Sequence, residues 1–224
     1  MSAYADAGSQ RWLQIAVNKK PELLNAALRK SGAIGPQDKV IWQSPLAPDN
    51  FCEYRDNAAL AKAGISNLKK PLNEFWPARG PVWDAVGVSD GNCSVFVEAK
   101  AHIPEAASPP SKASPVSLEL IQKSLVEARR FYAPKAKADW NNLFYQYANR
   151  LAHHYFLTKI NNAQSRLIFL YFVNAEDMDG PMSEQEWHGA SRLIHAVLGL
   201  PPDLRDHGVF DVFLDVRNLQ DVGR

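Results

Sequence analysis

The chain has 224 residues, of which 46% are hydrophobic and 22% are charged, and its formal net charge is +1. These fractions are ordinary for a globular protein and exclude the disordered, collagen-like and disulfide-dense classes. A chain of this length can bury enough surface for one core, so we expect one domain over residues 1–224. No apolar run approaches the roughly 18 to 20 residues that span a bilayer, so no membrane partner is expected.

The start of the chain and its two cysteines favour a cytoplasmic location. The first residues, MSAYADAGSQRW, have neither a basic start nor an apolar stretch, and so do not fit a signal peptide. Cys52 and Cys93 are therefore expected to be reduced thiols rather than a disulfide.

The charges are distributed unevenly along the chain. Residues 120–166 hold eight Lys or Arg against two Asp or Glu, whereas residues 167–224 hold four against ten. A protein of near-zero net charge can still present a basic face and an acidic face. The alternative is that these charges mix on solvated helix faces.

In chain order, the first predicted elements are helices. A helix is expected over 9–31, broken or bent near Pro21. Asp49 is expected to cap a second helix over 51–63. The following segment, FWPARGPVW, contains prolines and a glycine that exclude a helix.

A hairpin and a long loop are predicted next. Two strands are expected over 83–88 and 93–103, around the turn sequence SDGN. Residues 104–117 are rich in Pro and Ser, which precludes regular structure, so we expect a loop that leads into a helix. A long irregular loop inside a compact domain is more often functional or mobile than structural.

The second half of the chain alternates helices and strands. It predicts two helices, a strand, a third helix and a last strand, at 118–132, 140–157, 166–173, 183–199 and 209–216. The run RLIFLYFV is continuous and apolar, as is typical of a strand buried on both faces. Ser183 and Glu186 form a capping box at the start of the third helix. Together these elements predict an α/β (α+β) fold with a mixed central sheet flanked by helices.

The segment WDAVGVSDGNCSVFVEAKAH is the most informative part of the chain. Alternate residues of its second strand share a face, and one face is apolar while the other carries Glu98, Lys100 and His102. Unpaired charges on a central strand are costly, so this alignment indicates chemistry. Asp84 lies on the preceding strand. A three-residue loop over 90–92, or a bulge, would place Asp84 opposite Glu98, whereas a two-residue turn would place it on the other face.

Carboxylates at Asp84 and Glu98 would repel each other unless a positive charge lay between them. A hard divalent cation meets that need, because Mg²⁺ typically binds one or two carboxylates together with substrate phosphates. Lys100 would point to the same side of the strand. Its ammonium could orient an attacking water or offset charge on a phosphate.

This pattern of an Asp, a hairpin and a Glu-X-Lys sequence in an apolar strand resembles the PD-(D/E)XK nuclease superfamily. The motif stands here as Asp84, Glu98 and Lys100, with Trp83 at the position of the motif's proline. The resemblance covers about 50–175 and implies a restriction-endonuclease-like αβββαβ core, with an extra N-terminal helix and a C-terminal helix and strand. It also implies hydrolysis of phosphodiester bonds of nucleic acid with Mg²⁺ or Mn²⁺. DNA is favoured over RNA as the partner, and the sequence leaves both open.

The resemblance suggests further residues for the same site. Many members supply another carboxylate from a helix before the hairpin, and Glu53 is the first candidate here, as a third metal ligand, with Glu74 second. His102 is a candidate for contact with a phosphate, although a histidine at the edge of the sheet is an equal alternative.

Some branches of the superfamily also carry a polar stripe, centred on Gln, on the helix after the Glu-X-Lys strand. In this chain Gln146, Asn149, Arg150 and His153 fall at i, i+3, i+4 and i+7, which is one helical stripe. Gln146 and Arg150 are therefore candidates for substrate binding.

Each of these assignments has a structural alternative. The Asp–Glu–Lys set could form a surface salt-bridge network, Glu53 could be a solvated helix charge, and Gln146 and Arg150 could serve packing. The chain contains no zinc-enzyme, serine-hydrolase or nucleotide-binding motif. Two functions are therefore expected to compete: a metal-dependent nuclease, and a nuclease-fold relative that has lost catalysis and serves as a binding module.

Overall fold

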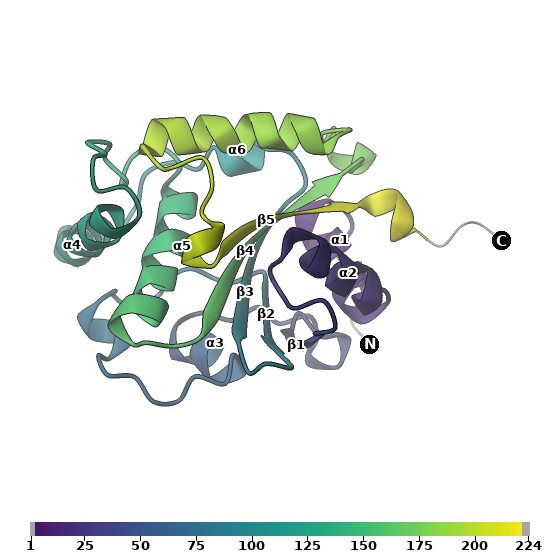
Figure 1. Ribbon diagram of the computed structural model, residues 1–224, viewed down its shortest axis with the longest axis horizontal. Coiled ribbons are helices and arrows are strands. Elements are labelled where there is room, and N and C mark those ends of the chain that lie inside the picture. The colour runs from purple at the N-terminus through teal and green to yellow at the C-terminus, as the bar shows by residue number, and fades with distance from the viewer. Residues whose placement is uncertain (1–2, 221–224) are drawn as a thin grey trace.

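The computed structural model describes residues 3–220, which build a five-stranded mixed sheet with helices on both faces (Figure 1). The strands lie in chain order: β1 (Val40–Ser44), β2 (Ala85–Ser89), β3 (Ser94–Lys100), β4 (Ser165–Val173) and β5 (Val209–Asp215). The pairs from β1 to β3 are antiparallel, and those from β3 to β5 are parallel. The predicted α/β class with a mixed central sheet is confirmed.

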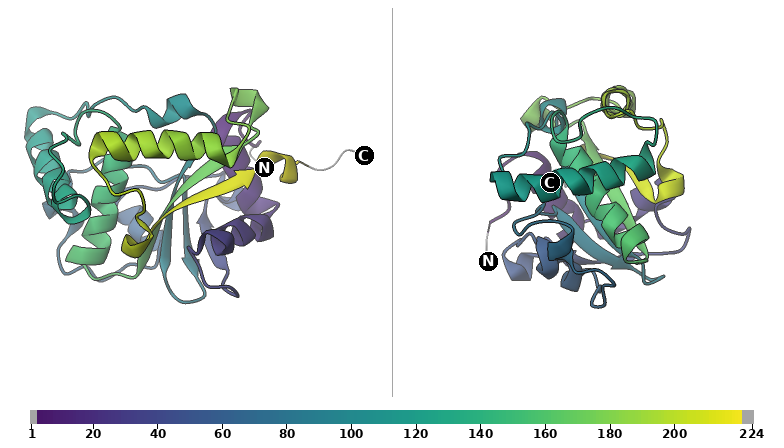
Figure 2. Two further views of the ribbon diagram at one scale, coloured as in Figure 1. Left: turned by 45° about the horizontal axis from the view of Figure 1, so that its top comes forward. Right: turned by 90° about the vertical axis from the view of Figure 1, so that its left-hand side faces the viewer.

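Six α-helices of the described residues flank this sheet. They are α1 (Gly8–Asn18), α2 (Pro21–Ser31), α3 (Asp56–Lys62), α4 (Pro115–Tyr132), α5 (Tyr145–Tyr155) and α6 (Glu184–Leu198). The first two cover one face and the other four cover the opposite face, where α4 stacks on the outside of α5 (Figures 1 and 2). Over residues 3–220, no helix combines the length and the apolar character needed to cross a membrane.

The predicted alternation along β3 is confirmed by the two apolar cores. Val95, Val97 and Ala99 are buried in the core under α1 and α2, whereas Phe96 belongs to the core under α5. Glu98 points to the same face as Phe96, since successive side chains of a strand alternate. The strand therefore brings two charged residues, Glu98 and Lys100, to the face beneath α5.

The strand β1 was not among the predicted elements. Its side chains alternate, with Val40, Trp42 and Ser44 buried and Ile41 exposed. Gly87 lets β1 approach β2, because a Cβ at that position would lie 2.5 Å from Cγ1 of Val40. The strand β1 lies before residue 50, outside the range over which the αβββαβ core was expected, and α3 separates it from β2.

The break predicted near Pro21 is confirmed, and the second prediction for the N-terminal region needs correction. Residues 9–31 form α1 and α2, and Pro21 occupies the first turn of α2, where its missing N–H costs nothing. The helix predicted over 51–63 begins only at Asp56, because Phe51 has a positive φ of 55° and Tyr54 pairs with Trp83 in an antiparallel β-bridge. Asp49 is therefore not a helix cap, and its carboxylate contacts the Tyr54 hydroxyl instead.

The later helices differ from the prediction mainly at their starts. Helix α4 begins at Pro115, inside the predicted loop, because Ser114 accepts a hydrogen bond from the Ser117 N–H. Helix α5 begins at Tyr145 rather than at residue 140, since Phe144 has a φ of 55°. At the predicted capping box of α6, Ser183 accepts a hydrogen bond from the Glu186 N–H as expected. The Glu186 carboxylate accepts from the Ser183 hydroxyl and the Met182 N–H instead of the Ser183 N–H.

Candidate functional site

The β2–β3 hairpin has the three-residue loop that the site requires. Ala85 pairs with Val97 and Val86 with Phe96, so the same register places Asp84 next to Glu98. Ser89 N–H donates to the carbonyl of Cys93, which leaves residues 90–92 as the loop. The loop closes with Asn92 in the left-handed region, at a φ of 56°, as Asn tolerates. The prediction of a loop over 90–92 is confirmed.

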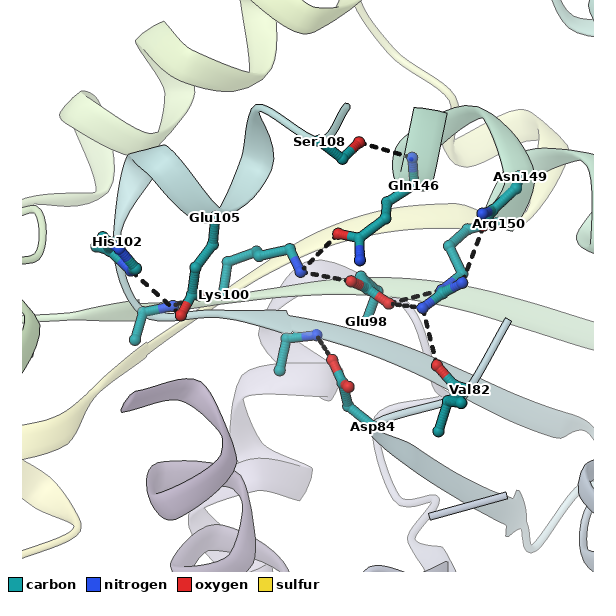
Figure 3. Close-up of polar contacts among 12 residues, drawn as sticks. Val82, Asp84, Glu98, Lys100, His102, Glu105, Ser108, Gln146, Asn149 and Arg150 are labelled. Carbon is teal, nitrogen blue, oxygen red and sulfur yellow. Dashed lines mark hydrogen bonds and ion pairs between the residues drawn. The ribbon is translucent and has the colours of Figure 1, made fainter. Parts of the chain in front are cut away.

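Asp84 lies just before β2, where that strand begins to separate from β3. Its Oδ2 accepts a 2.7 Å hydrogen bond from the Ala99 N–H, a donor that the sheet leaves free at this point (Figure 3). The carboxyl group is thereby fixed against the backbone of β3. Asp84, Glu98 and Lys100 line one cavity.

Glu98 is 3% exposed, and both of its carboxylate oxygens are engaged (Figure 3). Nζ of Lys100 donates to Oε1 at 2.5 Å, and Nε of Arg150 donates to Oε2 at 2.6 Å. A charge this deeply buried is tolerated only when it is paired and hydrogen-bonded. The two cations therefore hold Glu98 in one orientation.

The pKa values of the site diverge. Burial, with the negative charge of Glu98, raises the pKa of Asp84 to about 8. For Glu98, burial opposes ionisation, but the charges of Arg150 and Lys100 outweigh it and lower the pKa. Burial likewise opposes the charge on Lys100, yet the carboxylates of Glu98 and Asp84 raise its pKa. The arrangement keeps Glu98 ionised, and a further positive charge near Asp84 would favour its ionised form as well.

Helix α5 supplies the polar stripe that the sequence predicts. Oε1 of Gln146 accepts a hydrogen bond from Lys100, and Arg150 reaches Glu98 one helical turn later. The guanidinium of Arg150 also donates to Oδ1 of Asn149 and to the carbonyl of Val82. The guanidinium of Arg150 thus donates to groups of the protein. This is a structural role, which the prediction of substrate binding for Arg150 did not include.

His153, the last residue of the stripe, lies one turn farther along α5. Its Nδ1 contacts the carbonyl of Asn149, and Trp76 packs against its ring at 4.6 Å between centroids. Burial lowers the pKa of His153 to about 3, so the ring is neutral. His153 is therefore a packing residue behind the site.

The cavity has a volume of about 910 Å³, and two proline-containing segments wall it. One wall is 76–82, whose backbone is fixed by Asp56 through the N–H groups of Arg79 and Gly80. The other is 108–114, within the predicted Pro/Ser-rich loop, where Ser108 accepts a hydrogen bond from the Gln146 N–H. The loop thus closes the cavity and also satisfies a free N–H in the first turn of α5.

The other candidate residues for the site are Glu53, Glu74 and His102. Glu53 precedes α3 instead of lying within it, and it accepts a hydrogen bond from Gln10. Burial raises the pKa of Glu53, and the negative charge of Glu98 adds to the effect, although Glu53 is not among the residues that line the cavity. Glu74 is exposed in a short 3₁₀ turn. His102 pairs with Glu105 at 3.2 Å, and of these two only Glu105 lines the cavity.

The donor set of the site fits Mg²⁺ or Mn²⁺. Asp84 and Glu98 offer carboxylate oxygens, the hard donors that these ions prefer. Within residues 3–220, no three side chains of His, Cys, Asp or Glu are grouped so as to hold a metal ion by themselves. The remaining ligands would come from water and substrate phosphate, as is usual for Mg²⁺.

Comparison with protein-family models, with curated proteins and with solved structures gave no match for this chain. The assignment of a function therefore rests on the residues of the site. Sequence reasoning missed two of the groups that support it, the carbonyl of Val82 and the hydroxyl of Ser108. The carbonyl carries no sequence signal, whereas Ser108 belongs to the Pro/Ser-rich segment that the sequence marks as irregular.

Proposed function

We propose that this protein is a metal-dependent nuclease that hydrolyses phosphodiester bonds. The observation that carries the proposal is the hairpin register, which puts Asp84 beside Glu98 at a cavity that Lys100 also lines. These are the three residues through which the chain resembles the PD-(D/E)XK superfamily. Two carboxyl groups and a lysine in one cavity are suited to holding a divalent cation and to assisting attack on a phosphate.

In this proposal Asp84 and Glu98 hold the metal ion. When bound, Mg²⁺ or Mn²⁺ stabilises negative charge that develops on the phosphate. Lys100 lies within hydrogen-bond reach of Glu98, so its ammonium is positioned to orient water or to offset charge beside the same ligand. Arg150 acts as a positioning residue, because it fixes the Glu98 carboxylate from the opposite side.

The substrate we expect is DNA rather than RNA, in the cytoplasm. The resemblance favours DNA, and two cationic side chains at the cavity, Arg79 and Lys112, support contact with the phosphates of a nucleic acid. Such side chains contact phosphates without reading sequence, so binding should weaken as the salt concentration rises.

A second candidate function is favoured by one observation. Lys100 and Arg150 already neutralise Glu98, so a metal ion must share or displace an existing partner of that carboxylate. In a nuclease-fold relative without catalysis, this network would serve the fold alone, and the cavity would bind nucleic acid or another partner.

Cleavage assays separate the two functions. The substrates are single-stranded, duplex and branched DNA and single-stranded RNA, each with Mg²⁺, with Mn²⁺ and with EDTA. The nuclease proposal predicts cleavage that needs the metal and disappears in Asp84→Asn, purified in parallel as a control for contaminating nucleases. A wild-type protein that binds these nucleic acids and cleaves none of them would support the second function. Cleavage that survives in Asp84→Asn would place the reaction outside this site.

A further inference from the structure

A second cavity, of about 380 Å³, lies between α2, α6 and β5. Among the described residues, it has no lining residue in common with the cavity at Asp84. Figure 2 shows α6 running alongside β5, the last strand of the sheet. This position makes the second cavity independent of the proposed nuclease site, and nothing in that mechanism uses its residues.

Asp211 of β5 is the carboxyl group of this cavity that lacks a cationic partner. The hydroxyl of Ser191 on α6 donates to its Oδ2 at 2.7 Å. Over residues 3–220, no Lys or Arg forms an ion pair with Asp211, in contrast to the pairing of Glu98 in the first site. Burial raises the pKa of Asp211, as expected for a carboxyl group without such a partner.

The other charges at the cavity neutralise one another. Lys30 pairs with Glu184 at 2.9 Å, and Arg205 pairs with Asp203 through several hydrogen bonds. With these pairs formed, an ionised Asp211 gives the cavity a net negative charge. Its ligand is therefore expected to be positively charged.

The walls beside Asp211 are aromatic. His188 packs on Phe213 with 4.6 Å between ring centroids, and Tyr147 also lines the cavity. His195 has both ring nitrogens engaged, Nδ1 with the carbonyl of Pro201 and Nε2 with the Tyr147 hydroxyl, so neither is left for Asp211. Aromatic faces next to a carboxylate form the environment that attracts ammonium and guanidinium groups.

We infer that this cavity binds a small organic cation, with an ammonium or guanidinium group against Asp211 and an aliphatic part against the packed rings of His188 and Phe213. A volume of about 380 Å³ lies in the range of pockets for small molecules, about 300–1,000 Å³. A metal ion fits less well, because Asp211 is one carboxylate and the described residues place no set of three metal-binding side chains there.

Isothermal titration of the full chain with three small molecules tests the inference. The probes are 1,4-diaminobutane, butylguanidine and the uncharged 1-butanol. At least one cation should bind with a Kd below about 1 mM, and 1-butanol should not bind. The variant Asp211→Asn keeps the shape of the side chain and the Ser191 contact, and should weaken binding at least about tenfold because the charge is lost. Glu119→Gln, an exposed change on α4, should leave the affinity unchanged.

The results that would overturn the inference are equally definite. The inference would be overturned if the wild-type protein bound neither cation at 10 mM probe. It would also be overturned if the protein bound 1-butanol as strongly as the cations. Equal cation affinity in wild type and Asp211→Asn would likewise overturn it. If that variant fails to fold, as judged by circular dichroism, His188→Ala decides the question. Removing this exposed ring should weaken cation binding severalfold, and an unchanged affinity would contradict the assignment.

Discussion

Nε of Arg150 donates a 2.6 Å hydrogen bond to Oε2 of Glu98, although 52 residues separate the two along the chain. This contact joins α5 to the centre of the sheet. Lys100 donates a hydrogen bond to the other oxygen of the same carboxylate, so the buried Glu98 is held between two cations. The contact therefore serves stability and orients a proposed metal ligand at the same time.

Replacing Arg150 by Ala should lower the free energy of unfolding by about 3 kcal/mol, because it leaves a buried charge with one cation fewer. Urea titration measures this loss. The double variant Glu98→Gln/Arg150→Met should lose clearly less than the sum of its two single variants, since neither member of the pair then remains. Additive losses would show that the two side chains do not stabilise each other.

Stability should fall in acid because of His154, a buried neutral residue of α5. Burial lowers the pKa of His154 to about 4, and its ring contacts the Tyr132 hydroxyl and the Ser165 carbonyl. The unfolded chain takes up this proton near pH 6.5, so the stabilisation is complete above that pH and is lost as pH falls toward 4. Between these values His154 should contribute a slope of about 1.4 kcal/mol per pH unit.

Urea unfolding at pH 7 and pH 5, for wild type and His154→Gln, checks this contribution. The variant is expected to be less stable at pH 7 and to lose less stability on going to pH 5. Parallel pH dependence in the two proteins would mean that His154 does not resist protonation.

Lys100→Met should lower the cleavage rate about a hundredfold and change Mn²⁺ affinity by no more than a fewfold. The reason is that the ammonium acts on charge developing in the transition state, while the carboxylates hold the ion. Single-turnover cleavage and Mn²⁺ titration on the same preparation separate the two effects. Lys137→Met, an exposed change before α5, serves as the matched control and should match the wild type in both. A Lys100 variant with full activity would remove this residue from the mechanism.

Glu53 and Glu74 are the two candidates for a third carboxylate at the metal site, and their variants can be compared directly. Glu53→Gln should weaken Mn²⁺ binding about tenfold, because its carboxyl group interacts with Glu98, and outer groups of this kind tune metal affinity. Glu74→Gln should have no effect, since that side chain is exposed in a turn. Equal affinities in both variants would return Glu53 to the role of a solvated charge.

The sequence was sufficient for the hairpin because its signal is local. Alternating side chains and the SDGN turn predict two paired strands without knowledge of the rest of the chain. The register remained open, because it depends on whether the loop has two or three residues, and the structure shows three. The starts of α3 and α5 were missed because Phe51 and Phe144 adopt a positive φ, which aromatic residues rarely do and which tertiary packing imposes.

The partners of Arg150 could not be predicted for a different reason. Its position on a polar helical stripe is visible in the sequence, but its contacts with Glu98 and the Val82 carbonyl depend on how α5 docks on the sheet. Docking is a long-range property that periodicity does not contain. The sequence therefore identified the residue and offered packing as an alternative role, but it could not give the partners.

The most direct test of the proposed centre is a Mn²⁺ titration of the purified full chain, followed by electron paramagnetic resonance, with and without a non-cleavable phosphorothioate oligonucleotide. Wild type and Lys100→Met should bind Mn²⁺, more tightly when the oligonucleotide is present. Asp84→Asn should bind at least about tenfold more weakly, because one carboxylate ligand is lost. Equal Mn²⁺ affinity in wild type and Asp84→Asn, or no Mn²⁺ bound by wild type with the oligonucleotide present, would contradict a metal centre at Asp84 and Glu98.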